Sequence, residues 1–481
     1  MRKKFIFLIF VILLITPWPA HVYGGETADT AGAGIMERWV LSTLIENPSL
    51  AESNQLIFSE QEKQLMDGTA DRINQYRKGD ATVYVIDSEG RPLSNVVVEI
   101  EMLNHDFLFG GNCYMLGRYD NTILNRAYED AFTNLFNYAT LPFYWSAYDS
   151  NRDNCSVDHL KYVAQWAREH DIKTKGHPLV WASHMVPTCL PNDVNELDEL
   201  VEKRITNTIN EFNGSIDYWD VVNEPVVASF VDNPIGKWTE VRTPAISTAM
   251  ALGWAHNACP EASMLVNDFH TDDSFHRILE DIQAAGGEFD AIGLQSHMHK
   301  GTWQLDKVWN ICEEFKDFGI ALHFSELTVL SGALKTDNDW TGSYEGWNST
   351  KEGEAFQAEY VEALYTLLFS HPSVEAITWW DLSDMGANQG APAGLLHKDM
   401  SPKPAYDRLK RLIHEEWWTK ANLLTNEQGT ANWRGFYGEY KITILNGPQK
   451  VETRVHLKKG QENIFIVEFP ADISTVKSPG L

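Results

Sequence analysis

The sequence is short of basic charge, of cysteine and of long apolar runs. Its 39 lysine and arginine residues face 67 aspartate and glutamate residues, which gives a formal net charge of −28. A surface of that sign repels phosphate backbones and anionic lipids, so nucleic acid and membrane surfaces are poor candidates for partners. The five cysteines are odd in number, so at least one is free or pairs with another chain, and their spacing matches no zinc site.

Only one apolar run is prominent, Phe5–Ile15, and it is too short to span a bilayer comfortably. It follows three basic residues at 2–4 and precedes the small residues Ala20 and Gly24. This order is typical of a secretory signal, so residues 1–24 are predicted to be a signal peptide cleaved near 20–25. We therefore expect a secreted or periplasmic protein without a membrane-spanning helix.

Between 105 and 415 the pattern alternates between apolar strands and amphipathic helices. Eight runs end in polar or aromatic residues: Phe107–Asn112, Asn137–Trp145, Lys173–Trp181, Tyr218–Glu224, Ser263–His270, Ala291–His297, Ala321–Val329 and Ala376–Asp384. Eight strand–helix alternations over about 310 residues predict an α/β fold, a (β/α)8 TIM barrel. A doubly wound sheet is the alternative, but no glycine-rich phosphate loop follows the first strand.

The segments on either side of this region have a different pattern. Residues 35–78 are predicted to contain helices, whereas 79–104 and 420–470 alternate like β-strands. Neither β-segment makes a stable sheet alone, so we expect the two to pair into one small, β-sandwich-like domain. Because its strands come from both flanks of the barrel, a structural clasp is favoured over a sugar-binding module.

Two glutamates end strands of the predicted barrel. Glu224 ends the fourth strand, in Trp219-Asp-Val-Val-Asn-Glu-Pro225, and Glu326 lies on the seventh, in Phe324-Ser-Glu-Leu-Thr328. Reactive groups of such barrels lie at the C-terminal ends of the strands. Cleavage of a glycosidic bond needs two carboxyl groups, one to protonate the leaving oxygen and one to attack the anomeric carbon. The spacing in sequence does not supply the distance between them, which decides between retention and inversion of configuration.

The neighbours of these glutamates suit the same chemistry. Asn223 is placed to donate a hydrogen bond to a sugar 2-hydroxyl, and His297 to donate one that keeps Glu326 ionised. His297-Met-His299 also has the spacing of a metal-binding pair, but the two glutamates account for the pattern without a metal. No metal or other cofactor is therefore expected. The 17 tryptophans favour a sugar-binding protein, since indole rings stack on weakly polar sugar faces.

Six motifs, in order, resemble glycoside hydrolase family 10, the clan A barrels known mainly as endo-1,4-β-xylanases. The motifs are Gly176-His-Pro-Leu-Val-Trp181, Asp220-Val-Val-Asn-Glu224, Val266-Asn-Asp268, Ile292-Gly-Leu-Gln-Ser-His297, Ser325-Glu-Leu327 and Trp380. The resemblance implies that Glu224 is the general acid/base and Glu326 the nucleophile. It also implies that the cleavage point is lined by His177, Trp181, Asn223, Gln295, His297 and Trp380.

The sequence departs from the family on the glycone side. The family's Glu-Asn-x-x-Lys-Trp run is here Leu141-Pro-Phe-Tyr-Trp145, so only the tryptophan remains. The family's Trp-His and Trp-Gly pairs are here Trp181-Ala182 and Trp380-Asp381. A subsite that no longer pairs a sugar hydroxyl loses about 1–3 kcal/mol per unsatisfied group. Tyr144 and Trp145 are candidates for a stacking wall, and Asp381 for a new sugar contact.

These observations predict a secreted, retaining glycoside hydrolase that acts on a β-linked polysaccharide or oligosaccharide. Two alternatives stay open. The first is an endo-1,4-β-xylanase proper, in which other loops replace the missing subsite contacts. The second is a barrel that binds carbohydrate without cleaving it.

Overall fold

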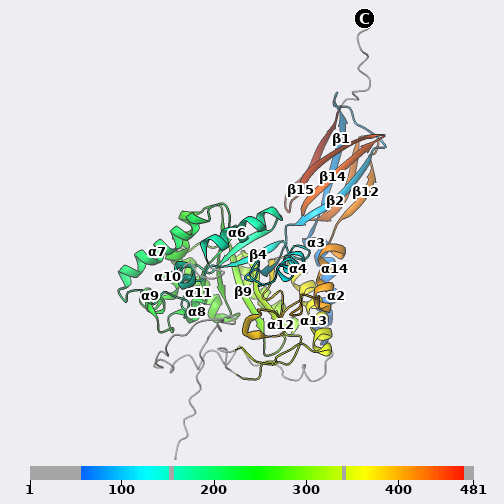
Figure 1. Cartoon of the computed structure of the whole chain (residues 1–481). Coiled ribbons are helices and arrows are strands. Elements are labelled where there is room, and N and C mark those ends of the chain that lie inside the picture. Colours follow the sequence, from blue (N-terminus) through cyan, green and yellow to red (C-terminus); the bar gives the residue numbers. More distant parts are fainter. Residues whose placement is uncertain (1–55, 151–155, 338–342, 471–481) are drawn as a thin grey trace, which may run out of the picture. The chain divides into compact units, whose positions relative to one another are not determined.

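The structure, a computed structural model, describes residues 56–150, 156–337 and 343–470 (Figure 1). The predicted signal peptide, and residues 35–55 of the segment expected to be helical, lie outside the described residues. The chain divides into two compact units. The first holds 108–368 and 373–409 together with the chain before Asp67, and the second holds 67–107, 369–372 and the chain from Lys410.

The first unit is built on a closed parallel barrel. Its strands are β3 (Leu108–Asn112), β4 (Tyr138–Pro142), β5 (Lys173–His177) with the short β6 (Val180–Trp181), β7 (Tyr218–Asn223), β8 (Ser263–Asp268), β9 (Ala291–Met298), β10 (Ala321–Val329) and β11 (Val374–Trp379). β11 pairs with β3, and β5 pairs with both β4 and β7, which closes the sheet. The predicted (β/α)8 barrel with an additional β-domain is confirmed, and the doubly wound sheet is excluded.

Helices follow the strands, as Figure 1 shows. They are α4 (Thr122–Thr133), α5 (Trp145–Asp149), α6 (Val157–Glu169), α7 (Val194–Glu211), α8 (Pro225–Ala228), α9 (Pro234–Arg242), α10 (Pro244–Ala258), α11 (Asp273–Ala284), α12 (Leu305–Phe315), α13 (Lys351–Ser370) and α14 (Pro404–Arg411). Side chains cap several of them, because the first backbone N–H groups of a helix have no intrahelical partner. Asn121, Ser156, Asp193 and Asp272 accept such bonds at α4, α6, α7 and α11.

The barrel strands are buried on both faces, which explains their nearly continuous apolar runs. Polar residues interrupt this core on the strands that lead to the predicted site. Lys175 on β5, Asp220 on β7 and His323 on β10 are all fully buried or nearly so. In the described helices, no segment is long and apolar enough to cross a membrane.

The second unit contains two β-sheets. One has the order β13 (Thr430–Phe436), β1 (Lys78–Asp87), β16 (Asn463–Phe469), and the other has the order β12 (Lys420–Leu424), β2 (Val97–His105), β14 (Gly438–Asn446), β15 (Gln449–Leu457). Alternate residues of β1 and β2 are buried, as the period of two predicts. The Trp433 ring packs against Phe465 of its own sheet and Tyr440 of the other, which makes this a sandwich.

The described residues before β1 form two short helices, within the segment expected to be helical. α2 (Glu60–Asp67) and α3 (Thr69–Tyr76) are separated at Gly68. Glu62 of α2 accepts a hydrogen bond from the backbone N–H of Leu305, where α12 begins. Arg77, just after α3, donates to the carbonyl oxygens of Phe369 and His371. A long charged side chain thus satisfies two carbonyl groups at the C-terminal end of α13.

Candidate active site

The two predicted catalytic glutamates lie at the C-terminal half of the barrel. Glu224 directly follows β7 and Glu326 lies on β10, and their exposed fractions are 9% and 4%. Glu224 adopts φ 57° and ψ 51°, a left-handed conformation that is uncommon for residues other than glycine. Its backbone N–H donates to the Asn267 carbonyl oxygen at 2.7 Å, which ties this turn to the end of β8.

The Glu224 carboxyl group is held by two side-chain donors. Trp181 Nε1 donates to Oε2 at 2.8 Å, and Gln295 Nε2 lies 3.2 Å from Oε1. Burial raises the pKa of Glu224 to about 8, and the negative charges of Asp268 and Glu326 add to this effect. A carboxyl group in this environment keeps its proton at neutral pH, as a general acid must.

Glu326 has the opposite electrostatic environment. Burial alone raises its pKa, but the positive fields of His177 and His297 outweigh burial and lower the pKa below the ordinary value. His297 Nε2 lies 3.0 Å from Oε2, His177 Nε2 lies 3.9 Å from Oε1, and Asn267 Nδ2 donates to Oε1 at 2.7 Å. Glu326 is therefore held as a carboxylate, the state that a nucleophile requires.

Amide side chains connect the two glutamates. Asn223 Oδ1 accepts from Asn267 Nδ2 at 2.7 Å and from Gln295 Nε2 at 3.3 Å. Since Gln295 also reaches Glu224 and Asn267 reaches Glu326, one hydrogen-bonded network contains both carboxyl groups. The two acidic side chains, 102 positions apart in the sequence, thus converge on one site. The contacts of Asn223 use its oxygen, which leaves its amide N–H groups suited to donate to a sugar hydroxyl.

A buried ion pair lies behind Glu326. The Nδ1 atom of His177 and the Nζ atom of Lys175 lie 2.7 and 2.9 Å from the same oxygen of Asp220, and all three side chains are buried. Burial opposes ionisation of Asp220, but Lys175 and His177 outweigh it and lower its pKa to about 2. The ionised Asp220 fixes Nδ1 of His177 as a donor, so that Nε2 is directed toward Glu326.

Aromatic rings form one wall of the site. The Trp380 ring lies 5.5 Å from the His177 ring, 5.6 Å from the His297 ring and 5.6 Å from the Tyr114 ring. The Tyr144 ring lies 5.9 Å from His177, and its hydroxyl group lies 3.3 Å from that of Tyr114. Tyr144 is half-buried and its ring lies beside this wall, and its stacking on a sugar stays a prediction.

Two other predicted sugar contacts are turned toward the protein. Trp145 is 7% exposed and donates from Nε1 to Asp149 at 2.7 Å, an arrangement typical of packing. Asp381 is also 7% exposed, and within the described residues its Oδ2 has no hydrogen-bond partner. Burial raises the pKa of Asp381 to about 7, although the Asn388 backbone opposes this shift.

Sequence reasoning missed several residues of this site. Tyr114 follows β3 on a loop, and Lys175 and Asp220 lie no further than the middle of their strands, before the C-terminal ends where reactive groups of a barrel are expected. Asp220 did lie within a recognised motif, but its neighbour Glu224 drew the assignment. His270 is a further case, because it lies near Glu224 only after β8 and the following loop have folded.

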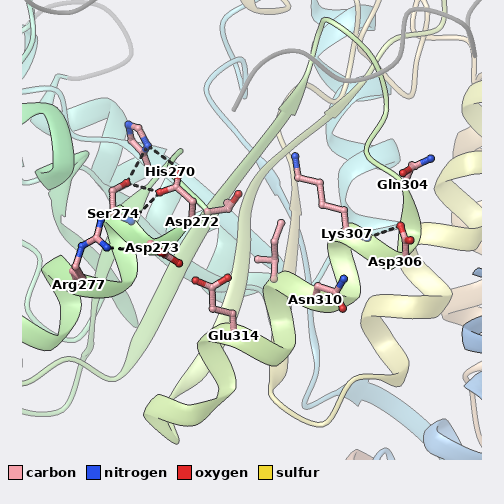
Figure 2. A pocket seen from close by; sticks show the side chains of 12 residues that line it. His270, Asp272, Asp273, Ser274, Arg277, Gln304, Asp306, Lys307, Asn310 and Glu314 are labelled. Carbon is pink, nitrogen blue, oxygen red and sulfur yellow. Dashed lines mark hydrogen bonds and ion pairs between the residues drawn. The ribbon is translucent and has the colours of Figure 1, made fainter. Parts of the chain in front are cut away.

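A polar groove opens beside His270, between α11 and α12. It has a volume of about 610 Å3. Figure 2 shows His270, Asp272 and Ser274 on one wall and Lys307 and Asn310 on the other. Over the described parts of the chain, no three His, Cys, Asp or Glu side chains are grouped so that they could hold a metal ion.

The structure is a closed (β/α)8 barrel with two buried glutamates, one on the turn after the fourth strand and one on the seventh strand. These features define a class of barrels that carry groups suited to acid–base and nucleophilic chemistry at their C-terminal face. The chain belongs to one family of that class, glycosyl hydrolase family 10, whose sequence profile matches residues 103–412.

Similar proteins include regulators as well as enzymes. Anti-sigma-I factor RsgI6 of Acetivibrio thermocellus is 26% identical over 408 residues, which cover 82% of this chain and 49% of that protein. Endo-1,4-beta-xylanase 2 of Arabidopsis thaliana is 22% identical over 390 residues, which cover 78% of this chain and 33% of that protein. The chain therefore spans half or less of the length of these relatives.

Solved structures support the fold. Xylanase 10B of Thermotoga petrophila RKU-1, solved in complex with xylobiose, superimposes with a TM-score of 0.53 at 20% identity, over 65% of this chain and 95% of that one. The family 10 structure from Paenibacillus barcinonensis gives a TM-score of 0.53 at 20% identity, over 64% and 95%. At this identity the likeness concerns the fold alone.

Proposed function

We propose that the protein is a retaining glycoside hydrolase that cleaves β-glycosidic bonds, with β-1,4-xylan as the first substrate to test. The observation that carries the proposal is the convergence of two buried carboxyl groups in one hydrogen-bonded network, in environments that shift their pKa values in opposite directions. Glu224 is held protonated and Glu326 is held ionised. Glycoside hydrolysis with retention needs this division of roles.

The reaction has two displacements. In the first, the Glu326 carboxylate attacks the anomeric carbon, the glycosidic C–O bond breaks, and Glu224 gives its proton to the leaving oxygen. In the second, water attacks the anomeric carbon of the glycosyl ester, Glu224 takes a proton from that water, and Glu326 leaves as a carboxylate.

The same electrostatics explain how Glu224 changes role. The negative charge of Glu326 is one cause of the raised pKa of Glu224. Formation of the ester removes that charge, so the pKa of Glu224 falls and the group becomes a base. Asn223 and the Trp380 wall would orient the sugar, through its 2-hydroxyl group and its apolar face respectively.

The substrate class rests on the relatives. Several matched proteins are named endo-1,4-beta-xylanase, and the structure from Thermotoga petrophila contains xylobiose. The apolar run 141–145 and the buried Asp381 change the contacts expected on the glycone side, so other β-glycans belong in the same screen. The pattern of residues 1–24 supports export of the enzyme to where such polysaccharides occur.

Carbohydrate recognition without turnover is the second candidate. One relative, similar over 82% of this chain, has the name of an anti-sigma factor rather than of a hydrolase. Both glutamates are present, each in the environment that its proposed role requires, and this favours the hydrolase over a protein that only binds carbohydrate.

The test is a screen of xylan and other β-glycans, with products followed by proton NMR. The wild-type protein should release the β-anomer first, because two inversions at one carbon restore its configuration. Glu326→Ala should abolish turnover and keep glycan binding, whereas Glu202→Ala, on the exposed face of α7, should leave the rate unchanged. Initial release of the α-anomer would contradict the double displacement. Binding of a glycan without any turnover would favour the second candidate, a barrel that binds carbohydrate without cleaving it.

A further inference from the structure

Asp268, the last residue of β8, connects two segments at the catalytic face. It is fully buried. Its Oδ2 accepts from the backbone N–H of Val226 at 3.1 Å, and its Oδ1 accepts from the backbone N–H of His270 at 2.8 Å. These N–H groups belong to the connections that follow β7 and β8, the first of which begins at Glu224 and continues into α8, so one carboxylate fixes both connections.

The first of these connections carries Glu224. A left-handed backbone is unfavourable for a residue with a Cβ atom, and it persists only where neighbouring contacts enforce it. Two contacts enforce it here: the bond from the Glu224 N–H to the Asn267 carbonyl oxygen, and the bond from Val226, two residues later, to Asp268. Both acceptors lie at the end of β8.

Asp268 also differs in its ion pairing from Asp220, the other buried aspartate of the site. Asp220 is paired with Lys175, whereas no lysine or arginine forms an ion pair with Asp268 in the described part of the chain. The ionisable groups that act on Glu224 are Asp268 from β8, Glu326 from β10 and His270 from the loop after β8. Asp268 exerts the larger effect of the two carboxylates on the pKa of Glu224.

We propose that Asp268 is the positioning residue of Glu224: it holds the turn that aims the Glu224 carboxyl group, and its negative charge adds to burial in keeping that group protonated for donation to the leaving oxygen. This inference rests on the proposed function. It assigns the two buried aspartates to different partners. Asp220 acts through His177 on Glu326, and Asp268 acts directly on Glu224.

The first experiment needs no substrate. Protein labelled with 13C at the glutamate side-chain carboxyl carbon is titrated by NMR, and the Glu224 signal is assigned by its absence in Glu224→Gln. In Asp268→Asn the like charge is gone, so Glu224 should titrate about one pH unit lower than in the wild type. An unchanged midpoint would overturn the inference.

The second experiment separates donation from attack. Phenyl and 2,4-dinitrophenyl β-xylobiosides differ in whether the leaving group needs a proton, and kcat/KM reports only the first displacement. Asp268→Asn should lower kcat/KM for the phenyl substrate by about tenfold or more, leave the dinitrophenyl substrate within about twofold, and move the alkaline limb to lower pH. The matched variant Asp220→Asn should lower both substrates alike.

The outcomes distinguish the two proposals. Equal losses on both substrates in Asp268→Asn would mean a general structural role and overturn the inference. If the wild type cleaves neither substrate while the NMR midpoint still moves, the proposed function fails and the positioning role stands. If Asp268→Asn does not fold, as judged by circular dichroism, Asp268→Ser keeps a hydroxyl acceptor without the charge and takes its place in both experiments.

Discussion

Glu224→Gln should make the protein more stable at neutral pH while removing its activity on unactivated glycosides. The pKa of Glu224 is about 8 in the folded state, against an ordinary 4.5. The unfolded chain ionises this group above pH 4.5, but the folded protein keeps the proton until about pH 8, so stability falls between these values. At pH 7 the penalty is about 3 kcal/mol, because each pH unit above the ordinary pKa adds about 1.4 kcal/mol. Glutamine has no such penalty and keeps an oxygen that accepts from Trp181.

The assay is urea unfolding at pH 4, 5.5 and 7, followed by tryptophan fluorescence. The stability difference between Glu224→Gln and the wild type should be near zero at pH 4 and should grow toward about 3 kcal/mol at pH 7. Glu202→Gln, on the exposed face of α7, should show no such dependence. A difference that stays constant with pH, or a glutamine variant less stable than the wild type at pH 7, would refute the assigned protonation of Glu224.

Three further predictions concern neighbouring side chains. Trp181→Phe removes a 2.8 Å hydrogen bond that is stronger when Glu224 is ionised and therefore favours that form, so the alkaline limb of kcat/KM against pH should move up by about one to two pH units; an unmoved limb would contradict the assigned bond. His297→Ala removes a donor that keeps Glu326 ionised, so the acid limb should move up by about one pH unit, and a shift to lower pH would argue against this role. Lys175→Met removes the ammonium partner of the buried Asp220 carboxylate and should cost about 3–5 kcal/mol in urea unfolding, whereas Lys173→Met, on the same strand but 59% exposed, should cost at most about 1 kcal/mol; equal costs would contradict the burial argument.

The barrel could be predicted from the sequence because its strands are buried on both faces. Such strands appear as continuous apolar runs: β7 and β8 fall within the runs identified from the sequence, and β9 extends one residue beyond its run. Glu224 and Glu326 were visible because each is a charged residue where an apolar strand ends or continues. Once the strands were counted, their positions on the fourth and seventh strands predicted that the two side chains share the C-terminal face of the barrel.

Other features depend on contacts that a sequence pattern does not carry. The left-handed backbone at Glu224 is imposed by Asn267 and Asp268, which lie more than 40 positions away. The parallel pairing of β1 with β16 likewise depends on contacts between residues far apart in the sequence: the pattern predicted that the two β-segments pair, but not which strands are neighbours. Lys175 reads as an ordinary polar residue in a strand, and only the position of Asp220 makes it part of the core. Tertiary contacts, rather than local preference, determine each of these features.

The most direct measurement is mass-spectrometric mapping of the covalent intermediate. The protein is incubated with 2,4-dinitrophenyl 2-deoxy-2-fluoro-β-xylobioside, whose fluorine slows the second displacement, and is then digested with pepsin. We predict one glycosyl adduct on the peptide that contains Glu326, absent in Glu326→Ala. An adduct on a different residue, or none in a preparation that releases reducing sugar from glycans, would contradict the assignment of Glu326 as the nucleophile.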